Sequence, residues 1–176
     1  MNMKHSFFAL VAVALVAACS NVTEINRAKS DTGPLKLNNV IVSTDERLLR
    51  SKGRDVGKSA AEFRADLTAA LAKELGPYSD PNGLPADVKV KVNEVYLARI
   101  VDRALVGTSY IDSTITVVDA ETGEEIVAPT KVRGNSDNLR APGPAGVITT
   151  QSLAKDYQSA INGYAKALAA SLVASK

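Results

Sequence analysis

The chain has 176 residues, a formal net charge of +2 and 45% hydrophobic residues, with five tyrosines, three phenylalanines and no tryptophan. This length fits one domain with a sizeable buried core. The near balance of charge gives no indication of a nucleic-acid partner, and the scarcity of aromatic side chains argues against a stacking platform for sugars or bases.

The first twenty residues have the order of a secretory signal peptide. Lys4 gives a positive start, an apolar run extends from Phe7 to Ala18, and the chain turns polar at Ser20. A membrane-spanning helix needs about 20 apolar residues, so this run is too short to span a bilayer comfortably. We therefore predict export of the chain and removal of residues 1–18.

The end of the apolar run, Val16-Ala17-Ala18-Cys19, resembles the lipobox of bacterial lipoproteins. The resemblance implies that the Cys19 thiol receives a diacylglycerol and that the chain is cut just before it. The new amino terminus would then take a fatty acyl chain such as palmitate. Cys19 is the only cysteine in the sequence, so it has no disulfide partner within the chain. The alternative is an ordinary signal peptide, cut after Ala18 or Ser20.

A lipid anchor would place the mature chain at the extracytoplasmic surface of a membrane, and two or three acyl chains would hold it far more firmly than one. In Gram-negative lipoproteins, aspartate after the cysteine favours retention in the inner membrane, and this chain has Ser20 instead. For a Gram-negative cell the resemblance thus implies the periplasmic face of the outer membrane. The predicted organisation is a removed signal peptide at 1–18, an acylated cysteine and tether at 19–34, and one domain at 35–176.

The only histidine, His5, lies in the predicted signal peptide. The mature chain would therefore have no histidine and no free thiol. This excludes Ser-His-Asp triads, Cys-His pairs and zinc sites with His or Cys ligands. We expect neither a metal nor a cofactor, while enzymes that use carboxylates or lysine stay compatible with the sequence.

The mature chain begins with a predicted strand, a loop and a helix. Alternating apolar residues predict a strand over 35–43, and a charged loop follows at 45–58. Ser59 and Glu62 match the S-x-x-E capping box, which predicts a helix over 59–75. The apolar stripe of this helix consists of Phe63, Leu67, Leu71 and Leu75.

The central part of the chain predicts two strands. Gly76-Pro77 is expected to end the helix. Valines that alternate with lysines predict a half-buried strand over 88–92. The apolar phase changes afterwards, which predicts a bulge or bend near Asn93-Glu94. After a short loop, the apolar pattern predicts another strand over 110–118.

The C-terminal part predicts a hairpin and a long helix. Residues 119–123 form a turn with a terminal glycine, and a partner strand follows over 124–133. Pro129 within that strand favours an edge position. Residues 134–146 form a loop, and a helix is predicted over 150–173. Its apolar stripe consists of Leu153, Tyr157, Ile161, Tyr164, Leu168 and Leu172.

The predicted order is β-α-β-β-β-α, which is typical of the α+β class. Two helices with apolar stripes and four strands predict a two-layer sandwich, with both helices on one face of a mainly antiparallel four-stranded sheet. The other face would be free for water or for a partner. In the alternative arrangement, the last helix packs elsewhere.

The segment from Gly53 to Ser59 resembles a phosphate-binding P-loop between a strand and a helix. The P-loop needs four residues between its glycines, and this segment has three. We also expect no parallel sheet, and Ser59 is already assigned as a helix cap. The sequence therefore does not predict a nucleotide ligand.

Two further patterns leave a small cell-envelope hydrolase as the alternative function. Ser152 and Lys155 have the S-x-x-K spacing and residues 136–138 read S-D-N, both known from penicillin-recognising enzymes. Their order is reversed, however, and no K-T-G motif follows. Carboxylates at Asp45-Glu46 and within 121–125 could serve a glycosidase, which holds two carboxylates about 5–10 Å apart, but turn residues in contact with water are the simpler interpretation.

A basic loop between the first strand and the first helix is the candidate contact for a partner or for anionic lipid. Arginine binds phosphate and carboxylate groups well, and such a loop near a membrane could meet charged headgroups. Interleaved acidic residues favour the simpler interpretation of a solvated loop. The candidate residues are Arg47, Arg50, Lys52, Arg54 and Lys58.

In its order of elements, the chain resembles small envelope lipoproteins such as the lipopolysaccharide-assembly lipoprotein and the auxiliary lipoproteins of ABC-type lipid transport. The resemblance covers most of the mature chain but includes no specific motif beyond the lipobox, so Cys19 is the one site residue that it implies. It favours a non-catalytic accessory module with an envelope protein as its partner, in transport, outer-membrane assembly or cell-wall synthesis.

Overall fold

The computed structural model describes residues 33–50, 52–99, 108–137 and 152–174. The elements in chain order are β1 (Leu35–Ser43), the 3-10 helix η1 (Glu46–Leu49), α1 (Ala60–Leu75), the 3-10 helix η2 (Gly76–Tyr78), β2 (Leu84–Tyr96), β3 (Tyr110–Asp119), β4 (Glu125–Asn135) and α4 (Leu153–Ala174). The predicted signal peptide, Cys19 and most of the tether lie outside the described residues. So does most of the loop predicted over 134–146.

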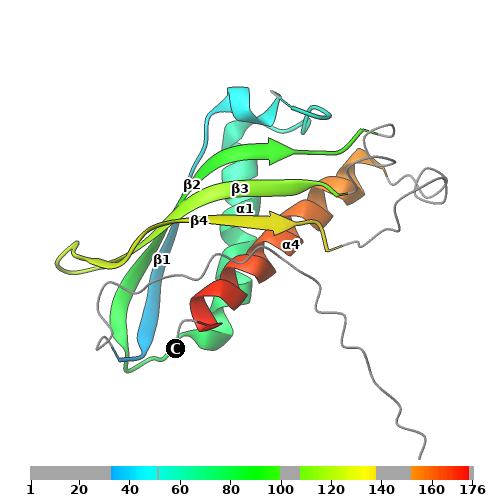
Figure 1. Ribbon diagram of the computed structural model, residues 1–176. Helices are drawn as coiled ribbons and strands as arrows, with labels where there is room; N and C mark the ends of the chain where they lie inside the picture. Colours follow the sequence, from blue (N-terminus) through cyan, green and yellow to red (C-terminus); the bar gives the residue numbers. More distant parts are fainter. Residues whose placement is uncertain (1–32, 51, 100–107, 138–151, 175–176) are drawn as a thin grey trace, which may run out of the picture.

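The four strands form one mixed sheet in the order β1-β2-β3-β4, and both helices lie on one face of it (Figure 1). This confirms the predicted α+β two-layer sandwich. Strands β2, β3 and β4 form an antiparallel meander, whereas β1 pairs with β2 in parallel. The sheet is therefore mainly antiparallel, as predicted, with one parallel pair at the β1 edge. Helix α1 carries the chain back along the sheet, so that β2 starts at the same end as β1.

Helix α1 begins at the predicted capping box. The Ser59 hydroxyl accepts a hydrogen bond from the Glu62 backbone N–H at 3.2 Å, and the Glu62 carboxylate accepts one from the Ser59 N–H at 2.9 Å. All four stripe residues are buried. The α-helix ends at Leu75, as Gly76-Pro77 predicts, and the chain continues as the 3-10 helix η2 because Gly76 keeps a right-handed helical conformation.

Strand β2 contains the predicted irregularity. Val88, Val90 and Val92 are buried against the helices, and the residues between them are exposed. The pairing register with β3 shifts between Val92 and Glu94, after which Val95 is buried. The bulge is confirmed, and it turns the Glu94 side chain toward the uncovered face of the sheet.

The β3–β4 hairpin and α4 also follow the sequence pattern. Gly123 has a φ of +74° at the turn, a left-handed conformation that glycine adopts without strain. Strand β4 forms one edge of the sheet, as Pro129 predicts. The stripe of α4 is buried from Tyr157 to Leu168, while Leu153 is 36% exposed at its start.

The segment predicted as a charged loop is more ordered than expected. Residues 46–49 form η1, and Leu49 and Val56 lie in the core. Gly53 forms a parallel bridge with Leu97, just beyond β2. The loop is therefore attached to the end of the sheet that also receives the first turn of α4.

Candidate functional site: the open face of the sheet

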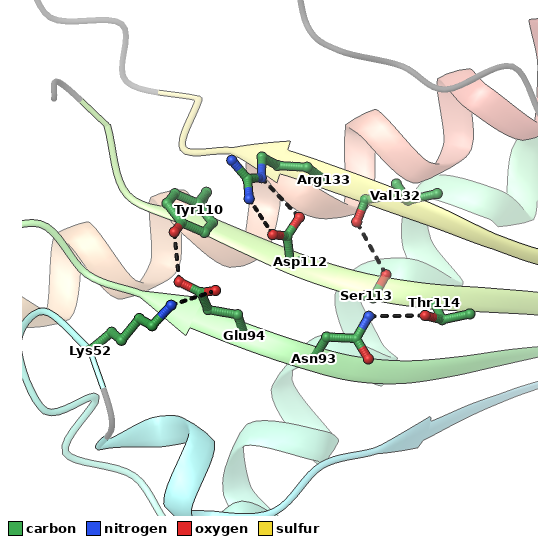
Figure 2. A network of polar contacts seen from close by, with 9 residues as sticks. All are labelled: Lys52, Asn93, Glu94, Tyr110, Asp112, Ser113, Thr114, Val132 and Arg133. Carbon is green, nitrogen blue, oxygen red and sulfur yellow. Dashed lines mark hydrogen bonds and ion pairs between the residues drawn. The ribbon is translucent and has the colours of Figure 1, made fainter.

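The sheet face that the helices leave uncovered carries an ordered polar network (Figure 2). We call it the open-face network and define it as Lys52, Glu94, Tyr110, Asp112 and Arg133. The Glu94 carboxylate accepts hydrogen bonds from the Tyr110 hydroxyl at 2.6 Å and from the Lys52 ammonium at 3.1 Å. The bulge in β2 thus places a carboxylate between a strand residue and a loop residue.

Arg133 and Asp112 form the second part of the network. They lie opposite each other in the β3–β4 register, and the guanidinium donates two hydrogen bonds to the carboxylate, one of them 2.9 Å long from Nε. Such bidentate pairs are among the strongest polar contacts in proteins. The guanidinium carbon also lies 4.3 Å from the ring centroid of Tyr110. The Tyr110 ring stacks on the ring of Tyr96, with 5.1 Å between the two centroids.

The protonation states in this network follow from its contacts. Burial raises the pKa of Tyr110 to about 12, and the hydrogen bond to the Glu94 carboxylate acts in the same direction. The hydrogen bonds to Asp112 raise the pKa of Arg133. Near neutral pH, the phenol therefore stays protonated as a donor and the guanidinium stays charged. Both carboxylates of the network are engaged by cations.

A partly open hollow of about 580 Å³ is lined in part by residues of the network. Across it, the Asn93 side-chain amide donates to the Thr114 hydroxyl at 2.9 Å. The hollow is lined by Asn93, Glu94, Asp112, Ser113, Thr114, Lys131, Val132 and Arg133. Hydrogen-bonding groups and charged groups of β2, β3 and β4 thus lie together around this hollow.

Three exposed lysines on the same face have no ion pair among the described residues. Lys89 and Lys91 project from β2 and Lys131 projects from β4. In the pairing register, Lys91 lies opposite Thr114, and Thr114 lies opposite Lys131. Lys91, Thr114 and Lys131 therefore form one row across the sheet, and Lys89 lies two positions before Lys91 on β2. Sequence reasoning missed this row. The alternation in 88–92 showed which side the lysines take, but only the strand pairing shows which residues lie beside them.

Two residues of the predicted basic loop form ion pairs that attach the loop to other elements. Lys52 contacts Glu94 at 3.1 Å. Arg54 pairs with Asp156 in the first turn of α4, where the two side chains are only 23% and 6% exposed. Ser109 also donates to the Asp156 carboxylate, at 3.3 Å. These two cations hold the loop against the sheet and against α4.

The other three residues of the basic loop also have acidic neighbours. Arg47 pairs with Asp45 at 3.0 Å, and Arg50 lies 3.7 Å from Asp55. Lys58 lies 3.8 Å from Glu62, and its contacts extend to Asp66 at 3.9 Å. The structure therefore does not bring the five cations together as one free patch, and their role in binding a partner or lipid stays a prediction.

The residues of the P-loop-like segment have structural contacts. A Cβ at Gly53 would overlap the backbone of Leu97, so this glycine allows the loop to approach β2 closely. Ser59 caps α1, as described above. In the S-x-x-K pattern, the Ser152 hydroxyl accepts from the Lys155 backbone N–H at 3.4 Å, ahead of the first turn of α4.

Within the part of the chain that the structure describes, no three His, Cys, Asp or Glu side chains are grouped as metal ligands would be. None of the described helices combines the length and apolar character needed to cross a bilayer.

Comparison with protein-family models and with curated protein sequences finds no match. Among solved structures, the chain is similar to a presumed lipoprotein from Caulobacter crescentus CB15, with 15% identity, a TM-score of 0.36 and coverage of 77% of this chain and 88% of that chain. PelC from Paraburkholderia phytofirmans, a dodecamer, gives 13% identity, a TM-score of 0.38 and coverage of 76% and 85%. A DUF330 protein from Xanthomonas campestris gives 8% identity and a TM-score of 0.39, with coverage of 81% of this chain and 88% of that chain. At these values the likeness carries no inference about function.

Proposed function

We propose that this chain is a non-catalytic binding module of the bacterial cell envelope, anchored to a membrane by acyl chains on Cys19, that assists a larger envelope complex. The observation that carries this proposal is the open face of the sheet, where polar side chains surround a partly open hollow. Small-molecule sites are usually concave and enclose most of the ligand. A broad, ordered and exposed face is better suited to a protein partner.

The pairing of charges supports binding over catalysis. A general acid or base must reach the proton that it transfers, whereas Glu94 and Asp112 already accept hydrogen bonds from neighbouring cations and from Tyr110. A rigid network of this kind preorganises a surface, which lowers the entropic cost of association. For this reason we favour the binding module over the hydrolase.

The anchor is tested by the intact mass of the mature protein purified from native membranes. We expect a chain that begins at Cys19 and carries a diacylglycerol and a further acyl chain. In a Gram-negative cell, we expect this chain at the periplasmic face of the outer membrane. The Cys19→Ser variant, as the control, should lack the lipid mass and leave the membrane fraction. An unmodified Cys19 thiol, or a different mature start, would contradict the anchor.

The binding surface is tested by photo-crosslinking in the native envelope. A photoreactive residue at Thr116, on the open face of β3, should give a protein adduct. The same residue at Ala72, exposed on α1, should not. Adducts from Ala72 alone would place the partner on the helices and contradict the proposed surface. Turnover of a cell-wall substrate by the purified chain, without any adduct from Thr116, would favour the hydrolase instead.

A further inference from the structure

We infer that the three exposed lysines on the open face receive acidic side chains of the partner protein. This inference rests on the proposed function, because it names the chemistry of the surface that the module binds. The lysines concerned are Lys89, Lys91 and Lys131, which we call the open-face lysines.

The open-face lysines are available because neighbouring acids are already engaged. Glu94 and Asp112 pair with cations of the network, as described above. Asp87, also on this face, accepts hydrogen bonds from the side-chain amides of Asn38 at 2.9 Å and Asn39 at 3.0 Å. The described residues therefore offer no ion pair to the lysines, and their charges face the solvent.

The spacing of the lysines fits carboxylates on an extended partner segment. Neighbouring strands lie about 4.8 Å apart, so the Cα atoms of Lys91 and Lys131 are roughly 10 Å apart with Thr114 between them. Lys89 and Lys91 are two residues apart on one strand, which is about 7 Å. Acidic residues at alternate positions of an extended segment have the same 7 Å spacing, and the Thr114 hydroxyl, which accepts a hydrogen bond from Asn93, can donate one to such a segment.

The mixture of charges favours a protein over a lipid surface. A membrane presents anionic headgroups evenly to the whole face, whereas the cations of the open-face network, Lys52 and Arg133, already pair with Glu94 and Asp112, and it is the open-face lysines that have no ion pair among the described residues. A partner protein can place its carboxylates opposite the lysines only. The exposed side chain of Ile41, paired in register with Lys89, adds an apolar contact of the kind found in protein interfaces.

The test compares two pairs of charge reversals in the full chain that carries the photoreactive residue at Thr116. Lys91→Glu with Lys131→Glu changes the open face. Lys73→Glu with Lys155→Glu changes the net charge equally on exposed helix positions. We expect the adduct to fall at least tenfold with the first pair and by less than twofold with the second. The adduct also maps the nearest acidic residue of the partner. Replacing that residue with lysine should restore the adduct yield of the chain that carries Lys91→Glu and Lys131→Glu.

The outcomes separate this inference from the proposed function. An adduct that persists with the first pair of reversals would overturn the acidic contact while the binding module stands. Absence of any adduct from Thr116 in the parent chain would overturn both. A vesicle arm compares phosphatidylglycerol with phosphatidylcholine vesicles. If the open-face lysines are needed for binding to the anionic vesicles but not for the protein adduct, they contact lipid, and the inference is wrong.

Discussion

Single glycines set how closely α4 lies on the edge of the sheet. A Cβ at Gly134 in β4 would overlap the Cα of Tyr164 and lie 2.9 Å from its Cβ. Because both atoms belong to packed elements, neither can move away cheaply. We therefore expect Gly134→Ala to lower the free energy of unfolding by about 1–3 kcal/mol, the usual cost of overpacking, as measured by urea denaturation.

Gly76 provides the matched control for that substitution. Nothing lies within 4 Å of a Cβ built there, although Pro77 follows and disfavours the helical angles of Gly76 for a residue with a Cβ. Gly76→Ala should cost clearly less stability than Gly134→Ala, because it creates no overlap with a packed element and because alanine restricts the unfolded chain. Equal effects of the two substitutions would show that the close approach of β4 and α4 does not limit the side chain at position 134.

The Tyr110 hydroxyl should make stability depend on pH in the alkaline range. Its pKa is about 12 in the folded protein and about 10 in an unfolded chain, so the folded state holds the proton more tightly. This stabilisation is complete below pH 10 and is lost as pH rises from about 10 to about 12. The free energy of unfolding of the parent should therefore fall more steeply over this range than that of Tyr110→Phe.

Urea denaturation at a series of pH values measures this difference. Burial also raises the pKa values of Tyr157 and Tyr164, but these residues are present in both proteins and their contributions cancel. Parallel curves for the parent and for Tyr110→Phe between pH 10 and 12 would contradict the raised pKa of Tyr110, to which burial and the hydrogen bond to Glu94 both contribute.

At the scale of elements, the Arg54–Asp156 ion pair attaches the loop before α1 to the start of α4. Removal of one partner from a mostly buried pair leaves the other charge poorly compensated. We expect Arg54→Met to lower the free energy of unfolding by about 2–3 kcal/mol, at or below the low end for buried pairs because the Arg54 side chain keeps some exposure. Chemical denaturation of the parent and of Arg54→Met measures this loss of stability.

A double-mutant cycle distinguishes this pair from independent contacts. Arg54→Met combined with Asp156→Asn should cost less than the sum of the two single changes, because the charges interact directly. Arg47→Met, in an ion pair exposed to solvent, should have no measurable effect. Additive effects at positions 54 and 156 would contradict the ion pair.

Local patterns predicted most elements because their causes are local. The capping box at Ser59 and the shift of apolar phase near Asn93 depend on residues within a few positions of one another, and both are found in the structure. The continuation of the chain through η2 was missed, because Gly76 can adopt helical as readily as left-handed angles.

Contacts between distant segments could not be predicted in the same way. The Lys52–Glu94 and Arg54–Asp156 pairs join residues 42 and 102 positions apart, and the parallel pairing of β1 with β2 depends on the path of α1. For this reason, the sequence offered the basic loop as a candidate contact but could not show which acidic residues its cations pair with. The row from Lys91 to Lys131 was visible only once β3 was placed between them.

For the whole molecule, the strand order predicts the distribution of local stability. Strands β2 and β3 have hydrogen-bonded neighbours on both sides, whereas β1 and β4 are edges. Backbone amides in edge strands open more readily. Hydrogen exchange followed by mass spectrometry should therefore show the slowest exchange in β2 and β3. Equally slow exchange in β1 would mean that the sheet opens only as a unit.

The parallel edge strand also determines how the molecule responds to a mechanical load. Strand β1 is the first element of the domain and bonds to one neighbour, and the Leu84 N–H donates to the carbonyl of Pro34 at 3.0 Å just ahead of it. Suppose that the chain is pulled at the residues before Leu35 while a partner holds the β2–β3–β4 meander. The force would then act along β1 and slide it past β2. The evenly spaced bonds of a parallel ladder would then share the load, so that the pair resists together instead of peeling apart bond by bond.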